Sequence, residues 1–86
     1  MQKPSLGRLV LAVGGKAVSN GTDTAPATIT RVWSEKDGIY LVNATVQPDC
    51  AEQRFASSAY LYENEEAARA TLSHPGMTAL YWPPRV

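Results

Sequence analysis

The chain of 86 residues has no surplus of charge of either sign, because eight lysines and arginines balance eight aspartates and glutamates. A general nucleic-acid-binding protein carries an excess of positive charge that neutralises phosphates. The balance therefore counts against DNA or RNA as the partner, and it leaves little repulsion between copies of the chain. A chain of this length also has room for only a modest core. Both features favour a homo-oligomer.

Cysteines and long apolar runs are scarce as well. Cys50 is the one cysteine, so no disulfide can form within the chain. A secreted domain of this size usually depends on disulfides, which favours a reducing compartment. The opening MQKPSLGR lacks the apolar segment of a signal peptide, and no run reaches the roughly 18 apolar residues of a membrane span. We expect a cytoplasmic protein without a membrane partner.

Residue sets that carry catalysis are also missing. The one histidine, His74, lies in the turn-like stretch SHPG, and no spacing relates it to Cys50. These two residues make neither a zinc site nor a supported nucleophile–base pair. We therefore predict no catalytic residues, no metal and no cofactor, and we predict that the protein is not an enzyme.

Two motifs resemble functional sites, one a pair of catalytic acids and the other a phosphate-binding loop. A purely structural role explains each of them better. Glu63, Glu65 and Glu66 resemble a pair-of-acids cluster, but acidic residues are also typical of a solvated helix start. The stretch Gly14-Gly15-Lys16 resembles a phosphate-binding loop. It lacks the second glycine, the Lys-Ser/Thr ending and the following helix, so a turn after a strand explains it better.

What the sequence does contain is a series of short β segments. Segments rich in β-branched and aromatic residues predict strands at 8–13, 27–33, 39–46, 57–62 and 77–82. Asp37-Gly38 predicts a tight hairpin, and Asn20-Gly21 suggests a shorter one within a long loop. Asn64 followed by two glutamates and several alanines predicts one short helix near 65–72.

This order of elements is that of a small five-stranded barrel of the Src-homology type, mainly β, formed by one domain over 1–86. In such a barrel the last strand closes against the first. An open antiparallel sheet with one helix across it fits the pattern nearly as well.

Aromatic residues are the remaining candidates for a site. Those in or beside predicted strands are Trp33, Tyr40, Tyr60, Tyr62, Tyr81 and Trp82. Packing in the core is the leading interpretation for most of them. Adjacent Tyr81 and Trp82 must point to opposite faces of a strand, so we expect at least one of them to be exposed. An exposed aromatic beside Arg8, Arg31 or Arg85 could stack a base, bind a peptide side chain or lie in a homomeric interface. The predicted ligand-binding residues are Trp33, Trp82, Tyr81, Arg8, Arg31 and Lys16.

Four stretches occur in a characteristic order: KPSLGRLV at 3–10, APATITRVW at 25–33, IYLVNATVQPD at 39–49 and the ending YWPPRV. This order resembles a group of small proteins encoded by tailed bacteriophages, most of which have no assigned function. The stretch PDCAEQRFASS and the helix-like NEEAARATL depart from that pattern. The resemblance implies a phage origin and a small β-barrel, and it implies no particular activity. With a phage origin, the expected cytoplasmic location becomes the host cytoplasm.

Three functions follow as hypotheses. The first is a non-enzymatic binding protein, such as an anti-defence inhibitor or a sponge that sequesters a nucleotide signal or a host protein. In the nucleotide version, a base would stack on Trp33 or Trp82 and Arg8, Lys16 or Arg31 would contact phosphate. The second is a minor virion or assembly component. The third is a weak nucleic-acid-binding barrel, which the charge balance disfavours.

Overall fold

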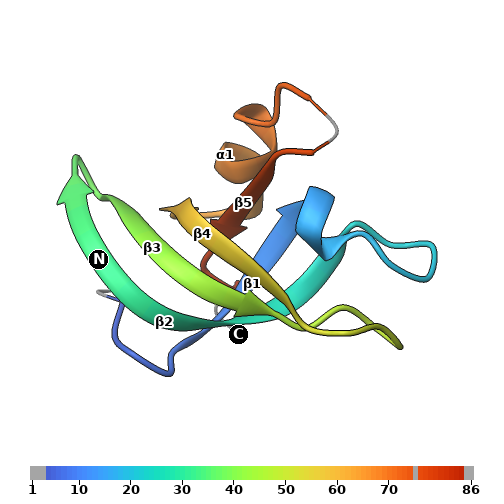
Figure 1. Cartoon of the computed structure of the whole chain (residues 1–86). Helices are drawn as coiled ribbons and strands as arrows, with labels where there is room; N and C mark the ends of the chain where they lie inside the picture. The colour runs from blue at the N-terminus through green and yellow to red at the C-terminus, as the bar shows by residue number, and fades with distance from the viewer. Residues whose placement is uncertain (1–3, 75, 85–86) are drawn as a thin grey trace.

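A computed structural model describes residues 4–74 and 76–84 of the chain and shows five strands closed into a barrel (Figure 1). In chain order the elements are β1 (Leu9–Gly14), the 3-10 helix η1 (Gly15–Ala17), β2 (Thr24–Lys36), β3 (Ile39–Val46), β4 (Arg54–Tyr62), α1 (Glu65–Ala70) and β5 (Thr78–Tyr81). The prediction of a mainly β barrel with one short helix is confirmed, and closure rules out the open sheet.

β5 closes the barrel by pairing on both of its edges. On one side it runs antiparallel to β1, from Leu11 opposite Tyr81 to Gly14 opposite Thr78. On the other side it runs parallel to β4, where Leu61 lies opposite Leu80. The parallel pairing requires a crossover connection, and α1 lies within it.

The predicted turns are present where residues tolerate a positive φ. Asp37 and Gly38 join β2 to β3 with φ angles of 54° and 82°. This left-handed pair matches the twist of the flanking strands. Asn20 and Gly21 adopt 52° and 85° within the long loop after η1. Both turn predictions are confirmed.

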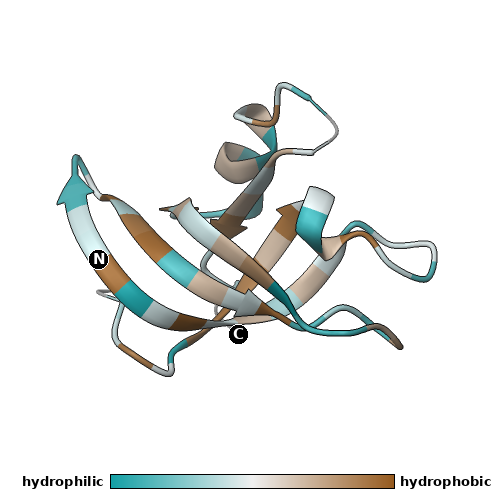
Figure 2. Cartoon of the chain, viewed as in Figure 1, coloured by the Kyte–Doolittle hydropathy of each residue, from teal (hydrophilic) through white to brown (hydrophobic). Residues whose placement is uncertain are grey.

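Small and branched side chains fill the barrel. The strands present hydrophobic and hydrophilic residues in alternation (Figure 2), so that Val42, Ala44 and Val46 of β3 are buried while the residues between them are not. The largest fully buried side chains are Ile29, Leu61, Leu80, Val10, Val13, Val42 and Val46.

α1 covers the outside of the barrel at β5. Asn64 caps the helix, since its Oδ1 accepts a hydrogen bond of 2.8 Å from the Ala67 amide. A second apolar cluster outside the barrel joins Val13 of β1 and Tyr81 of β5 to Ala68 of α1. The helix therefore adds a layer over a strand that would otherwise face water.

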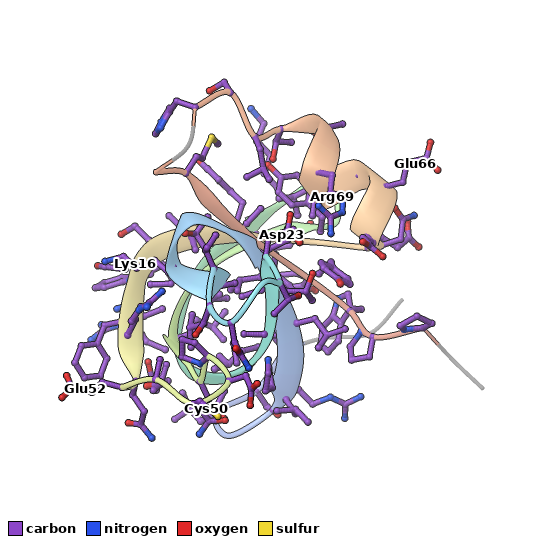
Figure 3. The ribbon with its side chains drawn as sticks, turned by 90° about the vertical axis from the view of Figure 1, so that its right-hand side faces the viewer. Lys16, Asp23, Cys50, Glu52, Glu66 and Arg69 are labelled. Atoms are coloured by element: carbon purple, nitrogen blue, oxygen red, sulfur yellow. The ribbon has the colours of Figure 1, made fainter. Side chains whose placement is uncertain are left out.

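An ion pair ties α1 to the loop before β2. Figure 3 shows Arg69 turned toward Asp23, and its Nη1 lies 2.8 Å from Oδ2 of that carboxylate. The Arg69 guanidinium, which donates to Asp23, holds the pKa of Asp23 below its ordinary value. Arg69 also lies 2.7 Å from Glu65 one helical turn earlier. The carboxylates of the predicted acidic cluster that lie in α1 are therefore part of an exposed helix start, as expected.

β2 and β3 extend beyond the rest of the barrel as a hairpin, which we call the β2–β3 arm (residues 30–41; Figure 1, left). β1 pairs with β2 only from Thr24 to Thr28, and the last described bond on that side joins the Gly7 amide to the Ile29 carbonyl. Every residue of β2 from Thr30 to Lys36 is exposed. The arm is therefore available to other molecules.

Candidate binding face

The structure places the predicted arginines and tryptophans in two separate pairs. The Arg31 guanidinium carbon lies 3.9 Å from the centre of the Trp33 ring, and that of Arg8 lies 5.4 Å from the Trp82 ring. Both separations are within the range of cation–π attraction. Trp33 is 49% exposed, whereas Trp82 is only 6% exposed. The Arg31–Trp33 pair is therefore the one that offers an open ring to a ligand.

The prediction that Tyr81 or Trp82 would be exposed is wrong. The two side chains do point to opposite faces of the chain, but both are buried. Trp82 belongs to the cluster inside the barrel. Tyr81 belongs to the outer cluster beneath α1, and burial raises the pKa of its hydroxyl. Arg85, the third arginine considered, lies outside the described residues.

Lys16 lies on η1 (Figure 3). The backbone amides of the Gly14-Gly15-Lys16 stretch are occupied within the protein. They donate to the Asp23 carbonyl, the Met77 carbonyl and Thr78 Oγ1 respectively. Amides that are already bonded cannot cradle a phosphate. The stretch is thus a turn after β1, as the sequence indicated.

The outside of β2, β3 and β4 carries a set of aromatic and apolar side chains, which we call the aromatic face. Its members are Trp33 of β2, Leu41 of β3, and Phe55 and Tyr60 of β4, with Arg31 and Asn43 among them. Tyr60 is 50% exposed and Phe55 is 70% exposed. The set thus exposes large rings of β2 and β4 to solvent on either side of β3.

Strand register puts these residues on one side of the sheet. Leu41 lies opposite Tyr60 in the β3–β4 pairing, and Arg31 lies opposite Asn43 in the β2–β3 pairing. Directly opposed residues point the same way. Leu41 and Asn43 alternate with the buried Val42, so they face outward. The aromatic face is therefore the outer surface of the sheet, and not an accidental grouping of chain segments.

Asn43 fixes the middle of the aromatic face. Its Oδ1 accepts two hydrogen bonds, one of 2.9 Å from Trp33 Nε1 and one of 2.7 Å from the Ser58 amide. The register of β2 shifts between Val32 and Ser34, which leaves Trp33 without an opposed residue. Ser58 lies in a similar irregularity of β4, with a φ of 54°. One amide oxygen thus connects two bulges and orients the exposed indole.

Replacing Asn43 tests this orientation. We expect Asn43→Ala to lower the free energy of unfolding by about 1–2 kcal/mol, because two donors lose their acceptor. We also expect faster solvent exchange of the Trp33 indole N–H, measured by NMR. Asn43→Asp keeps a side-chain oxygen and is the matched control, for which both quantities should stay close to wild type. Equal exchange rates in all three proteins would contradict the orienting role.

Three members of the face escaped the sequence analysis. Phe55 lies before the predicted start of the fourth strand, since β4 begins at Arg54 rather than at residue 57. Asn43 and Leu41 lie within the predicted strand 39–46 but were not assigned to a site. The signal that could have found them is alternation, because these positions face away from Val42 and Ala44.

Other types of site are not found in the part of the chain that the structure describes. Within residues 4–74 and 76–84, no group of three or more His, Cys, Asp or Glu side chains could hold a metal ion. No helix there is long and apolar enough to cross a membrane. Comparison of the chain with protein-family models, with curated proteins and with solved structures finds no match. The candidate site therefore rests on its geometry.

Proposed function

We propose that this protein is a non-enzymatic binding protein that holds a partner protein against the aromatic face. The observation that supports this most is the exposure of Trp33, Phe55 and Tyr60 on one side of the same sheet. Tryptophan, tyrosine and arginine are the residues that most often dominate protein–protein binding energy. A contiguous exposed apolar patch on a small protein is typical of an interaction site.

A protein fits this face better than a nucleotide does. A nucleotide needs cations that converge on its phosphates beside the stacked base. Of the three predicted cations, only Arg31 lies at Trp33, since Arg8 lies over Trp82 and Lys16 belongs to η1. The exposed rings belong to β2 and β4, with β3 between them, instead of lining one cleft.

A small hollow beside Tyr60 can receive a side chain of such a partner. It has a volume of about 210 Å³ and is lined by Ile39, Tyr60, Tyr62, Lys36 and Asp37. Pockets for small molecules usually span about 300–1,000 Å³. The hollow is below that range, and it suits a single apolar side chain that anchors a larger partner.

The biological setting stays a hypothesis that comes from the sequence resemblance. A phage protein acting in the host cytoplasm would use the aromatic face to inhibit or sequester a host defence component. A minor virion or assembly component would use the same face to contact another particle protein. Both settings require a protein partner, so one biochemical test serves both.

We expect Trp33→Ala and Tyr60→Ala to weaken binding to a partner protein by about tenfold or more each. The partner is first captured from bacterial host lysate and from disrupted phage particles with the wild-type protein, and then purified for calorimetric titration. Val18→Ala is the matched control, because Val18 is an apolar residue 50% exposed in the loop after η1 and is not a member of the face.

The proposal predicts that the control binds like wild type while both face variants lose affinity. Equal loss in all three variants would mean that the partner uses a different surface. If a nucleotide quenches the fluorescence of Trp33 saturably and Trp33→Phe abolishes that quenching, the ligand of the aromatic face is a nucleotide and not a protein. The remaining tryptophan, Trp82, is buried and serves as the internal reference.

A further inference from the structure

A polar hollow in the barrel wall, between β4 and the start of β5, is separate from the aromatic face. It has a volume of about 160 Å³. Its polar lining residues are Lys16, Ser57, Ser58 and Thr78, and its other lining residues are alanines and a glycine. The polar residues come from three elements that are distant in the sequence, η1, β4 and β5. The fold therefore brings one ammonium and three hydroxyls to the same place.

The hollow exists because β4 and β5 are paired over a short length. In the described part of the chain, β5 pairs with β4 from Leu61 onward, beyond the residues 56–59 that line the hollow. At the other end, the Arg54 guanidinium reaches from β4 to η1. Its Nη1 donates to the carbonyls of Lys16 and Val18 at 3.2 and 2.8 Å. The strand pairing and this side chain therefore bound the hollow along β4.

A bulge in β4 exposes two neighbouring serines. The register of the β3–β4 pair shifts between Val42 and Ala44, which leaves Ser57 and Ser58 together opposite one residue of β3. Adjacent residues of a regular strand point to opposite faces. Here both serines are exposed, and Ser58 has a φ of 54°. Bulges commonly re-aim side chains beside functional sites, and this bulge places both serines at the hollow.

The polar side chains of the hollow are available as donors. Within residues 4–74 and 76–84, no residue accepts a hydrogen bond from the Lys16 ammonium or from the hydroxyls of Ser57 and Ser58. Thr78 Oγ1 accepts a hydrogen bond of 2.8 Å from the Lys16 amide, so its own proton can be donated elsewhere. The described lining residues include no acidic side chain, and Figure 3 shows Lys16 beside β4. The hollow therefore favours an anion over a cation.

We propose that this hollow binds a tetrahedral oxyanion, either inorganic phosphate or the phosphoryl group of a phosphomonoester. The oxygens of such a group accept hydrogen bonds, which matches three hydroxyls arranged around one ammonium. The Arg54 guanidinium adds positive potential nearby, since it is bonded to the Lys16 carbonyl. The Lys16 side chain thus has a role that its occupied backbone amide does not have.

The size of the hollow limits the ligand to the anionic group itself. A volume of about 160 Å³ corresponds to roughly five water molecules, which is enough for a phosphorus atom with its four oxygens. Pockets that enclose whole small molecules usually span about 300–1,000 Å³. The remainder of a phosphomonoester would therefore lie outside. No lining residue belongs to the aromatic face, so the inference does not depend on the proposed function.

NMR titration with inorganic phosphate tests the site, at constant pH and with sodium chloride holding the ionic strength constant. We expect saturable shifts of the Ser57, Gly76 and Thr78 amide signals, with a Kd in the millimolar range. Lys16→Gln removes the ammonium and should raise this Kd by about tenfold or more. Lys36→Gln is the matched control. It removes the same charge from a residue that does not line this hollow, and it should bind phosphate like wild type.

Ser57→Ala gives a second measurement that leaves every charge in place. Loss of one hydroxyl donor should raise the Kd by about threefold or more. Thermal melting of each variant checks that it is folded. Trp33→Ala should bind phosphate like wild type, because Trp33 belongs to the aromatic face.

Glycerol phosphate is titrated in parallel to identify the source of the phosphate group. If it binds as inorganic phosphate does, the hollow recognises a phosphoryl group whose substituent stays outside. If inorganic phosphate alone binds, the hollow holds the free anion, and either result supports the site. Shifts that do not saturate would overturn the inference. So would equal affinity in wild type and Lys16→Gln, because phosphate would then act only as part of the general ionic atmosphere.

Discussion

A chain that lacks residues 79–86 is expected to stay unfolded under conditions in which the full chain melts cooperatively. The deletion removes nearly all of β5, which pairs with β1 on one edge and with β4 on the other. It also removes four buried side chains, Ala79, Leu80, Tyr81 and Trp82. Truncating one large core side chain usually costs about 2–5 kcal/mol, and a domain has only about 5–15 kcal/mol of stability. The loss of three such side chains and a strand exceeds that margin.

Circular dichroism and urea titration measure this outcome. The control is a chain that lacks only residues 83–86, which keeps all of β5 and Trp82 and should still unfold cooperatively. If the chain without residues 79–86 melts at the same temperature as the full chain, β5 does not close the barrel in solution.

Gly14→Ala is expected to destabilise the protein by at least about 3 kcal/mol, through two effects at one residue. Gly14 has φ 95° and ψ −158°, a conformation that is almost restricted to glycine. A Cβ at this position would also lie 2.3 Å from the Met77 carbonyl oxygen, which is a backbone atom and cannot move aside cheaply. Strain of this kind costs about 1–3 kcal/mol before the collision is counted.

Gly21→Ala separates the two effects. Gly21 also has a positive φ, 85°, but no heavy atom beyond Gly21 and its two chain neighbours lies within 4 Å of the position of its added Cβ. We expect this control to lose only about 1–2 kcal/mol, from backbone strain alone. Equal losses for the two variants in urea titrations would show that the contact between Gly14 and Met77 does not matter to stability.

The sequence was sufficient for the strands and turns because their determinants are local. Alternation over residues 39–46 matched β3 at both ends. Asp37-Gly38 forms the predicted hairpin turn because both residues tolerate a positive φ. β2 proved longer than the predicted 27–33, because strand pairing with β3 continues through the polar residues Ser34 to Lys36. Hydrophobic pattern alone does not detect a polar strand that is held by its neighbour.

The exposure of the closing strand was mispredicted because it depends on a third element. Strand geometry correctly required Tyr81 and Trp82 to point in opposite directions. Whether the outward side meets water depends on where α1 lies, and α1 covers Tyr81. Long-range docking of a helix leaves no periodic signal in the strand it covers.

The candidate site was predicted only in part, again because it depends on contacts between elements that are distant in the sequence. Trp33 and Arg31 were both singled out from the sequence, and the structure brings them together because they are two apart on one strand. Arg8 and Lys16 were grouped with them only by residue type, and the topology keeps them elsewhere. Asn43 joins Trp33 through a hydrogen bond between strands, which depends on two bulges that local sequence does not encode.

The pairing of β1 with β5 has a consequence for the speed of folding. Leu11 meets Tyr81 about 70 positions further along the chain. Barrels dominated by such distant contacts fold in about milliseconds to seconds, much more slowly than helical proteins of equal size. The β2–β3 hairpin has local contacts and can form first, whereas the search that brings β5 to β1 sets the rate. Until β5 pairs with β1, both edges of the sheet are open to other chains, and a partly folded chain of this kind is prone to aggregate.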